Sequence, residues 1–585
     1  MGTETERGKS DSTSIDSFVS EARELEAQIA WHYEQIKILK AKRNAIVPIR
    51  RLPNELMTRI FTIFAVDSDS PLSEALFSLK WTKIMKVCQH WYSLALAAQH
   101  LWAFIDLKWS SSNSRRLLAQ LERSGAAPLT IKLNLRSYSN HYASYVVGHS
   151  ARIRELEFAG EAKYIFAFIA TLPHSDFTSL SSLSLDASSH LDQLPNEIGR
   201  SLPSVLLEGR LPHLQSLSLD SINLPWTALR GLTSLSLTRC ADSSQSNPST
   251  FAGLLDMLAA SPLLRYLKLH RICPAPIPEQ FYPTIDLPEL ASLTLQDPEN
   301  RCQALIEHLH FPLHASLNLF PHGLHSGADI RDILVPIRRR LRSPGVPAPL
   351  LLKLYRTREA QCATSFHNTT TPPDLLSRLN MECPLSMNCH PSTEHNLRQM
   401  LTKLIKAVPS NFITHLDGRE TYSMRPATWH TVIRLLPSLE TIHLLSNRGA
   451  VSCITALQQI ALMDSDRRRT FPELHRLHII VFRLDSGDNA VTDTLTALEE
   501  FFQLEPAVGT FLKTVEFVDS QDVLCDGGPL DAKLQHMFAL TKADIIVNGE
   551  IYDPIQREKE LAQFREEQKA FALKYGLEYS YPGDD

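Results

Sequence analysis

The sequence lacks the features that mark membrane proteins and secreted proteins. No stretch of the 585 residues approaches the roughly 20 apolar residues that a membrane-spanning helix needs. The start, MGTETERGKSDSTS, is polar and acidic and has neither the basic nor the apolar region of a secretory signal. Nine cysteines are spread from Cys88 to Cys525, without the close spacing of a disulfide scaffold. We therefore expect an unanchored protein of the cytoplasm, the nucleus or both.

A strong charge of one sign and recognisable catalytic motifs are also missing. The formal net charge is -5, and a composition of 43% hydrophobic and 21% charged residues is ordinary for a globular chain of two or more domains. There is no G-x-S-x-G or H-E-x-x-H motif. The glycines of GTETERGKS are one residue too far apart for a phosphate-binding loop, and no strand precedes them. We expect no catalysis and no cofactor.

Two groups of residues leave alternatives open. One gathers cysteines and histidines that could suggest zinc, but its nearest cysteine pair is C-x5-C, and structural zinc sites use closer pairs. Scattered loop residues and no metal are the favoured interpretation. The basic clusters at 338–342 and 467–469 could serve nuclear import or nucleic-acid binding, but solvated loop charges are favoured, so nucleic acid is not an expected partner. The cysteine and histidine group consists of Cys362, His367, Cys383, Cys389, His390 and His395.

The N-terminal region predicts a disordered segment followed by a long helix. Residues 1–16 are rich in Ser, Thr, Glu and Asp, and residues 17–47 contain neither Pro nor Gly before Pro48. The helix has a seam at alternating steps of four and three, as in a coiled coil, although two seam residues are polar. Either a single helix packs on its own domain, or a short coiled coil dimerises. The seam consists of Phe18, Ala22, Leu25, Ile29, His32, Ile36, Leu39, Arg43 and Ile46.

The segment IRRLPNELMTRIFTIFAV at 49–66 carries more apolar surface than one core contact requires. A helix that begins near Asn54 would present apolar side chains over more than the roughly 100° stripe of an ordinary surface helix. Something beyond its own core is therefore expected to cover it. A polar loop and a second helical run at 78–102 follow.

The order LPNEL, polar loop, KVCQHW, SLALAA and LW over residues 50–107 resembles the F-box, a motif of three helices, as it occurs in fungal F-box proteins whose N-terminal helix runs directly into it. The resemblance implies docking onto a Skp-type adaptor and, through it, a cullin and RING complex that ubiquitinates proteins. The alternative is a helical subdomain packed on the rest of the chain. The expected adaptor-binding residues are Leu52, Pro53, Leu56, Ile60, Phe61, Val87 and Trp91, and further matches to the motif are Glu55, Cys88, Leu101 and Trp102.

The remainder of the chain repeats the pattern L-x-x-L-x-L. Five clear copies, LSSLSL, LQSLSL, LTSLSL, LRYLKL and LASLTL, resemble leucine-rich repeats of irregular length, and looser copies lie near 156, 442 and 477. Their fold class would be α/β, a solenoid with parallel strands; unrelated strands of an α/β domain are the alternative. Side chains alternate along a strand, so the leucines should be buried and the residues between them should face outward. The middle leucines are Leu183, Leu217, Leu235, Leu267 and Leu293.

These patterns predict the domain order and two functions. A repeat domain at 108–550, irregular around 321–410, follows the F-box at 48–107, and a capping helix and tail at 551–585 end the chain. Outward Tyr266 and Lys268 are the expected substrate-binding residues. One function is a substrate-recruiting subunit of a ubiquitin ligase of the SCF class. The other is a repeat scaffold that binds partners without ubiquitination.

Overall fold

A computed structural model divides the chain into two compact units. Unit 1 comprises Met1–Ile198 and Val205–Leu214, and unit 2 comprises Gly199–Ser204 and Gln215–Asp585. The expected boundary between 107 and 108 lies inside unit 1, because strands follow directly on its helices. The structure describes residues 10–65, 76–77, 79–107, 113–135, 148–161, 164–165, 177–187, 211–240, 250–277, 280–321, 330–356, 362–369, 385–389, 391, 393–422, 424–445, 448–463, 474–481, 490–504, 512–519 and 529–575.

Unit 1 begins with helices. The long helix starts at Ser10, so residues 10–16, which the sequence predicted to be disordered, are helical. The single helical run expected at 78–102 is instead three short helices, because Cys88 is extended (φ -161°, ψ 167°) and Ala98 is also non-helical (φ -78°, ψ 77°). The elements are α1 (Ser10–Ala45), η1 (Pro48–Arg51), α2 (Asn54–Ala65), η2 (Lys80–Lys86), α4 (Gln89–Ala97), α5 (Gln99–Trp102) and α6 (Asn113–Arg123).

Aromatic side chains hold these helices together. The rings of Trp81 and Trp102 lie edge to face with centroids 4.9 Å apart, and the Trp102 indole N–H donates a hydrogen bond of 2.9 Å to the Ala95 carbonyl. The guanidinium of Arg123 stacks over Trp102 at 4.5 Å, which joins α6 to the cluster. Met57 and Phe61 of α2 are buried in the same core.

Four parallel strands complete unit 1. They are β1 (Phe104–Leu107), β2 (Leu129–Leu135), β3 (Ile153–Gly160) and β4 (Ser182–Asp186), with η3 (Ser150–Arg152) before β3. Register places Ile105, Ile131, Leu156 and Leu183 side by side, and all four are buried. The predicted repeat at Leu183 and the looser copy at Leu156 are therefore neighbouring turns of one solenoid.

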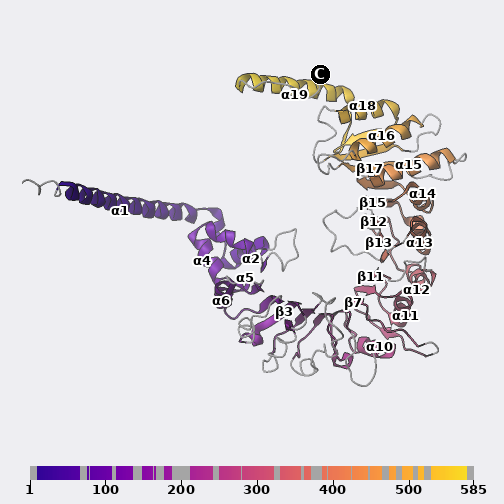
Figure 1. Ribbon diagram of the computed structural model, residues 1–585, viewed down its shortest axis with the longest axis horizontal. Helices are drawn as coiled ribbons and strands as arrows, with labels where there is room; N and C mark the ends of the chain where they lie inside the picture. Colours follow the sequence, from indigo (N-terminus) through magenta and orange to yellow (C-terminus); the bar gives the residue numbers. More distant parts are fainter. Residues whose placement is uncertain are drawn as a thin grey trace, which may run out of the picture. The chain divides into compact units, whose positions relative to one another are not determined.

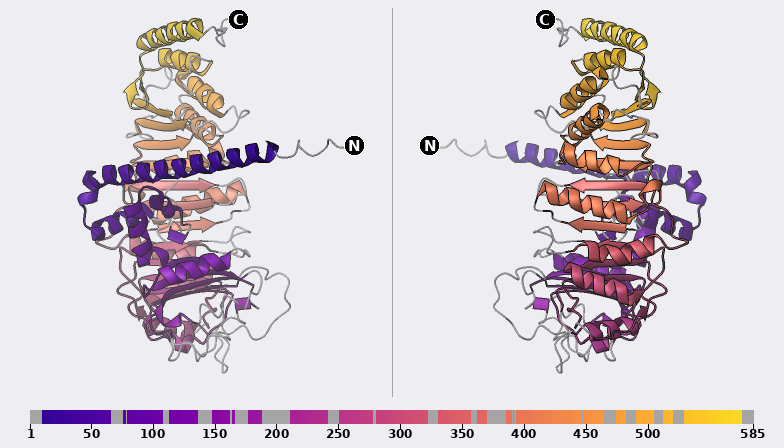
Figure 2. Two further views of the ribbon diagram at one scale, coloured as in Figure 1. Left: turned by 90° about the vertical axis from the view of Figure 1, so that its left-hand side faces the viewer. Right: turned by 90° about the vertical axis from the view of Figure 1, so that its right-hand side faces the viewer.

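Unit 2 alternates strands with helices. In Figure 1 the helices from α10 to α18 line one side of this unit and the strands the other, and Figure 2 shows the strands stacked one above another. The elements are β5 (Ser216–Asp220), η5 (Trp226–Ala228), β6 (Ser234–Thr238), α10 (Phe251–Ala259), β7 (Tyr266–His270), β8 (Ile285–Asp286), β9 (Ser292–Gln296), α11 (Glu299–His308), β10 (Leu309–His310), β11 (Ser316–Leu319), α12 (Arg331–Leu341), β12 (Leu351–Arg356), β13 (Cys362–His367), β14 (Leu385–Cys389), α13 (Glu394–Ala407), η7 (Ser410–Phe412), β15 (His415–Thr421), α14 (Pro426–Arg434), β16 (Thr441–Leu445), α15 (Arg448–Met463), β17 (Arg476–Val481), α16 (Ala490–Gln503), β18 (Thr514–Asp519), α18 (Pro529–Leu540), β19 (Asp544–Val547), β20 (Glu550–Ile551) and α19 (Pro554–Tyr575).

One row of apolar side chains crosses the sheet of unit 2 from β5 to β19. Each member pairs in register with the next, and each is at most 2% exposed. Unrelated strands would not share such a row, so the solenoid interpretation and the α/β fold class are confirmed. We call these residues the core row: Leu217, Leu235, Leu267, Leu293, Leu317, Leu385, Phe366, Leu352, Leu416, Ile442, Leu477, Val515 and Ile545.

The corners after three successive strands repeat the same backbone conformation. Ser221, Arg239 and Arg271 follow β5, β6 and β7 directly and have φ of 60°, 53° and 53°. The amide N–H of each donates a 2.8 Å hydrogen bond to the last residue of the following strand in the sheet. The left-handed conformation is costly for residues other than glycine, but here the neighbouring coil holds it in place.

The region around 321–410, which the sequence predicted to be irregular, departs from parallel pairing. Strand β13 is antiparallel to both β12 and β14, and β11 pairs with β14 rather than with the next strand along the chain. The hairpin strands are inserted into the sheet, so the core row continues through Leu385 and Phe366. The helices on the other side remain in sequence, each packed against the next from α11 to α16.

Candidate interaction surfaces

The helix α2 has one buried face and one exposed apolar face. Met57, Phe61 and Ala65 lie in the core of the helical segment. The exposed face follows the spacing i, i+4, i+7 and i+8, and its exposed fractions are 47%, 38%, 66% and 54%. Such spacing is typical of helices that enter a groove of another protein. We call Leu56, Ile60, Ile63 and Phe64 the α2 face.

The remaining adaptor-binding residues predicted from the sequence lie in different environments. Pro53 is exposed, Leu52 is half-buried against the helical core, and Val87 at the end of η2 is 57% exposed. Phe61 is 1% exposed and its ring lies 5.2 Å from that of Trp91, which is partly buried. Phe61 and Trp91 therefore position α2 against α4 and are not part of an exposed surface.

A second surface is formed by the outward residues of unit 2, which lie one position after each member of the core row, or one position before it on the antiparallel strand β13. The same register makes them a continuous line across the sheet. We call them the outward row: Ser218, Ser236, Lys268, Thr294, Asn318, Ser386, Ser365, Lys353, Asp417, His443, His478, Glu516 and Ile546.

Alternation within the repeats agrees with the sequence at nearly every position. Tyr266 is 59% exposed and Lys268 is exposed, whereas Leu267 between them is 1% exposed. Leu217 and Leu219 are buried, but Leu214, which the repeat pattern predicts to be buried, is only half-buried. It lies in the turn before β5, where its N–H donates to the Leu211 carbonyl.

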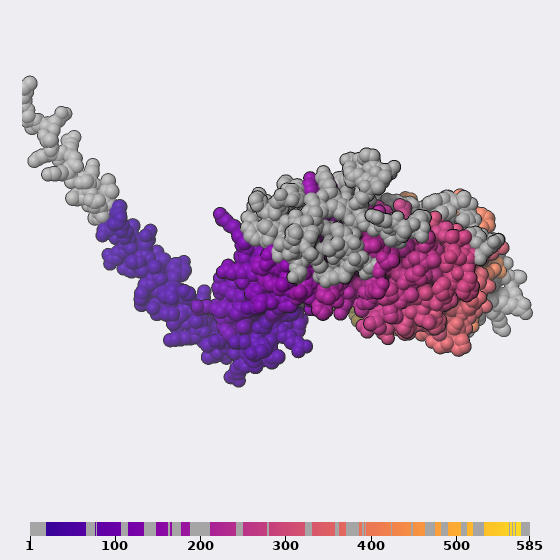
Figure 3. Space-filling model, turned by 90° about the horizontal axis from the view of Figure 1, so that it is seen from below, coloured from indigo at the N-terminus to yellow at the C-terminus, as the bar shows by residue number. Residues whose placement is uncertain are grey.

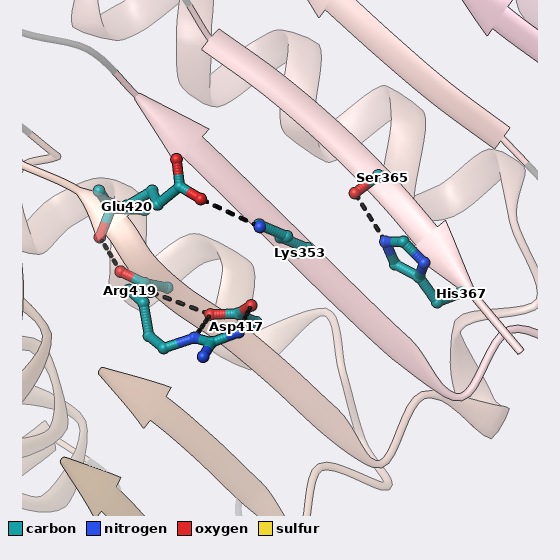
Figure 4. A network of polar contacts seen from close by, with 8 residues as sticks. Lys353, Ser365, His367, Asp417, Arg419 and Glu420 are labelled. Carbon is teal, nitrogen blue, oxygen red and sulfur yellow. Dashed lines mark hydrogen bonds and ion pairs between the residues drawn. The ribbon is translucent and has the colours of Figure 1, made fainter. Parts of the chain in front are cut away.

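The C-terminal half of the outward row contains a network of ion pairs (Figure 4). The Arg419 guanidinium donates two hydrogen bonds of 2.9 Å to the two carboxylate oxygens of Asp417, whose side chain is 0% exposed. Beside this pair, Lys353 lies 3.0 Å from the carboxylate of Glu420. A buried bidentate pair of this kind is strongly oriented, so it fixes the backbone of β15 at this point.

Histidines flank this network on both sides. Those on β15, β16 and β17 lie in a row: His415 and His443 are stacked with centroids 5.8 Å apart, and the rings of His443 and His478 are tilted with centroids 4.9 Å apart. Burial lowers the pKa of His443 to about 3, with the neighbouring His478 acting in the same direction. Burial and Lys353 lower the pKa of His367 on β13 to about 4. Both rings are therefore neutral at pH 7.

Sequence reasoning did not identify this network. The strands β12 and β15 lack the L-x-x-L-x-L pattern, and the pairing of Lys353 with Asp417 joins residues 64 positions apart through an inserted hairpin. The exposure of Ile63 and Phe64 was closer to prediction, because the surplus of apolar residues on α2 pointed to an uncovered face. The sequence did not predict which apolar residues of α2 lie in the core and which lie on the surface.

The cysteine and histidine group does not form a metal site in the part of the chain that the structure describes, where no three potential ligands converge. Cys362 and His367 occupy opposite ends of β13, and His395 lies on α13. Cys383 and His390 fall outside the described residues, as do residues 467–469 of the second basic cluster. Among the described helices, none is long and apolar enough to cross a membrane.

Comparison with known proteins finds similarity among solved structures. No model of a known protein family matches the sequence, and no curated protein matches it. The crystal structure of the leucine-rich repeat-containing protein LegL7 from Legionella pneumophila is similar, with 14% identity and a TM-score of 0.25 over 70% of this chain and 98% of that chain. The fold assignment rests on strand register rather than on this similarity.

The neutral histidines predict that the free energy of unfolding decreases as the pH is lowered from 7 to 5. In the unfolded chain a histidine takes up a proton near pH 6.5, whereas folded His443 stays neutral until about pH 3, so the unfolded state binds more protons in between. At pH 5 this term costs roughly 2 kcal/mol of unfolding free energy per histidine. We expect His443→Gln to reduce the loss of stability between pH 7 and pH 5 by about that amount.

Chemical denaturation of each variant at both pH values measures this loss, and a uniform destabilisation by the substitution cancels in the difference. His314→Gln is the matched control, because His314 is exposed. If His443→Gln and His314→Gln keep the same pH dependence as the parent chain, His443 is not held neutral in the folded protein.

Proposed function

We propose that the protein is an interaction scaffold that binds a partner protein along the outward row of unit 2. What supports this proposal is the register itself, because it gathers polar side chains from many strands into one continuous line. Solenoids commonly bind through such a surface. The N-terminal part of the row carries mainly hydroxyl and amide side chains, together with the exposed Lys268. Tyr266 lies two residues before Lys268 on the same face of β7 and is 59% exposed. An exposed tyrosine beside a lysine offers apolar area, a hydrogen bond and a charge in a small space.

If the partner binds this surface, substitutions of its exposed residues should reduce binding without loss of stability, whereas substitutions in the core row should reduce stability. A Tyr266→Ala, Lys268→Ala double variant should keep its melting temperature but lose partners that the parent chain labels in a proximity-labelling experiment in cells. Leu267→Ala should instead cost about 2 to 5 kcal/mol of stability, because it leaves a cavity in the core row.

The control is Val335→Ala, Arg338→Ala on α12, which removes one exposed apolar and one exposed basic side chain from the helix layer. Equal labelling by the Tyr266 and Lys268 variant and by the parent chain would contradict the assignment of the surface.

A second candidate function is recruitment of that partner to a ubiquitin ligase of the SCF class. The specific observation in its favour is the α2 face, an exposed apolar surface on a segment whose sequence resembles the F-box. In this function the α2 face and Val87 would dock a Skp-type adaptor, and unit 2 would hold the substrate near the ubiquitin-loaded enzyme. The chain would contribute proximity, while other subunits carry out the transfer. The scaffold function requires only the solenoid, whereas the ligase function also requires the α2 face.

Leu56→Ala, Ile60→Ala tests this second function. Truncation of interface anchors typically costs about 2 kcal/mol or more each, so binding of a purified Skp-type adaptor should weaken at least about thirtyfold. Leu118→Ala on α6 is the control, since Leu118 is an exposed leucine elsewhere in unit 1. Titration calorimetry measures both. If the parent chain does not bind the adaptor, the scaffold function stands alone.

A further inference from the structure

The helix α1 has no packing partner among the residues that the structure describes. Every side chain from Val19 to Arg43 is exposed, and the helix extends away from the rest of unit 1 in Figure 3. The interpretation that it packs on its own domain is therefore wrong for this part of the helix. Four large apolar side chains of the predicted seam are about half exposed: Leu25 is 52%, Ile29 54%, Ile36 47% and Leu39 63% exposed.

The seam has the geometry of a two-stranded coiled coil. Its alternating steps of four and three place Ala22, Ile29, Ile36 and Arg43 at a positions, and Leu25, His32 and Leu39 at d positions. In proteins most of the stability of a helix comes from packing of its apolar face rather than from helix propensity, so an exposed apolar seam calls for a second helix of the same period. A second copy of this chain supplies that helix with matching length and spacing.

Charge along α1 is divided between its two halves. Between residues 19 and 31 the charged residues are Glu21, Arg23, Glu24 and Glu26, which give a formal charge of -2. Between 33 and 45 they are Glu34, Lys37, Lys40, Lys42 and Arg43, which give +3. Two copies that run in opposite directions therefore lay an acidic half against a basic half at both ends.

Individual positions distinguish the two orientations. In a parallel pair, Arg43 faces Arg43 and His32 faces His32 in the seam, and Glu21 at g lies beside Glu26 at e of the other copy. In the antiparallel pair, a positions meet d positions, so that Ala22 meets Leu39 and Leu25 meets Ile36. Glu21 then lies on the same side as Lys42 of the second copy, and like charges are separated.

We propose that α1 pairs two copies of this chain as an antiparallel coiled coil, which would give the assembly two binding surfaces. Two linked surfaces raise the avidity for a multivalent partner without any new contact. This pairing does not depend on either function proposed above.

Sedimentation equilibrium of the full chain tests the pairing. We expect a dimer, and we expect Leu25→Glu, Ile36→Glu to raise its dissociation constant at least about thirtyfold, as loss of central anchors does. The matched control is Ala27→Glu, Ala41→Glu, which adds the same side chains at f positions on the opposite face and should leave the dimer intact. A monomeric parent chain at about 100 μM, a tetramer, or equal effects of the two variants would overturn the proposal.

Cysteine cross-linking tests the direction. Under mild oxidation, chains with Ala22→Cys should cross-link to chains with Leu39→Cys but not to other chains with Ala22→Cys. The parent chain measures the background from native cysteines. Cross-linking of Ala22→Cys chains to themselves would show a parallel pair and overturn the antiparallel arrangement.

Discussion

Burial of the core row is the constraint on which unit 2 depends. Each strand that the row crosses contributes one fully buried apolar side chain in register with its neighbours, and the helix layer packs beside these strands. Because side chains alternate along a strand, fixing Leu267 and Leu293 inward also fixes Lys268 and Thr294 outward. A shift of one residue would bury the polar row and expose the apolar one, so the core row and the proposed binding surface are set by the same register.

The outward row changes its chemistry along the unit. From Ser218 to Ser365 it is mainly uncharged, with Lys268 as the exception, and under the proposed function it would bind a partner by hydrogen bonds and local contacts. From Lys353 onward it contains charged residues and histidines that satisfy one another in part, and Asp417 is fully buried by its neighbours. The proposed binding surface is therefore the first part of the row, whereas Lys353 and Asp417 in the second part lie on neighbouring strands next to the inserted hairpin and are paired within the sheet.

The regular repeats of this architecture could be predicted from the sequence, whereas the pairing of the inserted strands could not. All five middle leucines of the clear repeats are buried as predicted, because local spacing alone decides which side of a strand they occupy. Leu385 and Phe366 could not be predicted in this way, since their burial depends on β11 pairing with β14 across an insertion. At the helices, the surplus of apolar residues predicted an uncovered face, but the burial of Phe61 and the exposure of Ile60 depend on how α2 turns toward Trp91. Periodicity shows which residues share one face of a helix or strand, but contacts between distant segments decide whether that face is buried.

The most direct test of this account is a cross-link at the point where strand order departs from chain order. Neighbouring strands lie about 4.8 Å apart, within the range that a disulfide spans, whereas β12 is three strands from β11, at roughly 14 Å. A chain with Asn318→Cys and Ser386→Cys should therefore form that disulfide on mild oxidation, with the linked peptides identified by mass spectrometry. A chain with Asn318→Cys and Lys353→Cys should not. Efficient cross-linking of the second pair in place of the first would show that the strands follow chain order and that the proposed core and outward rows are not continuous.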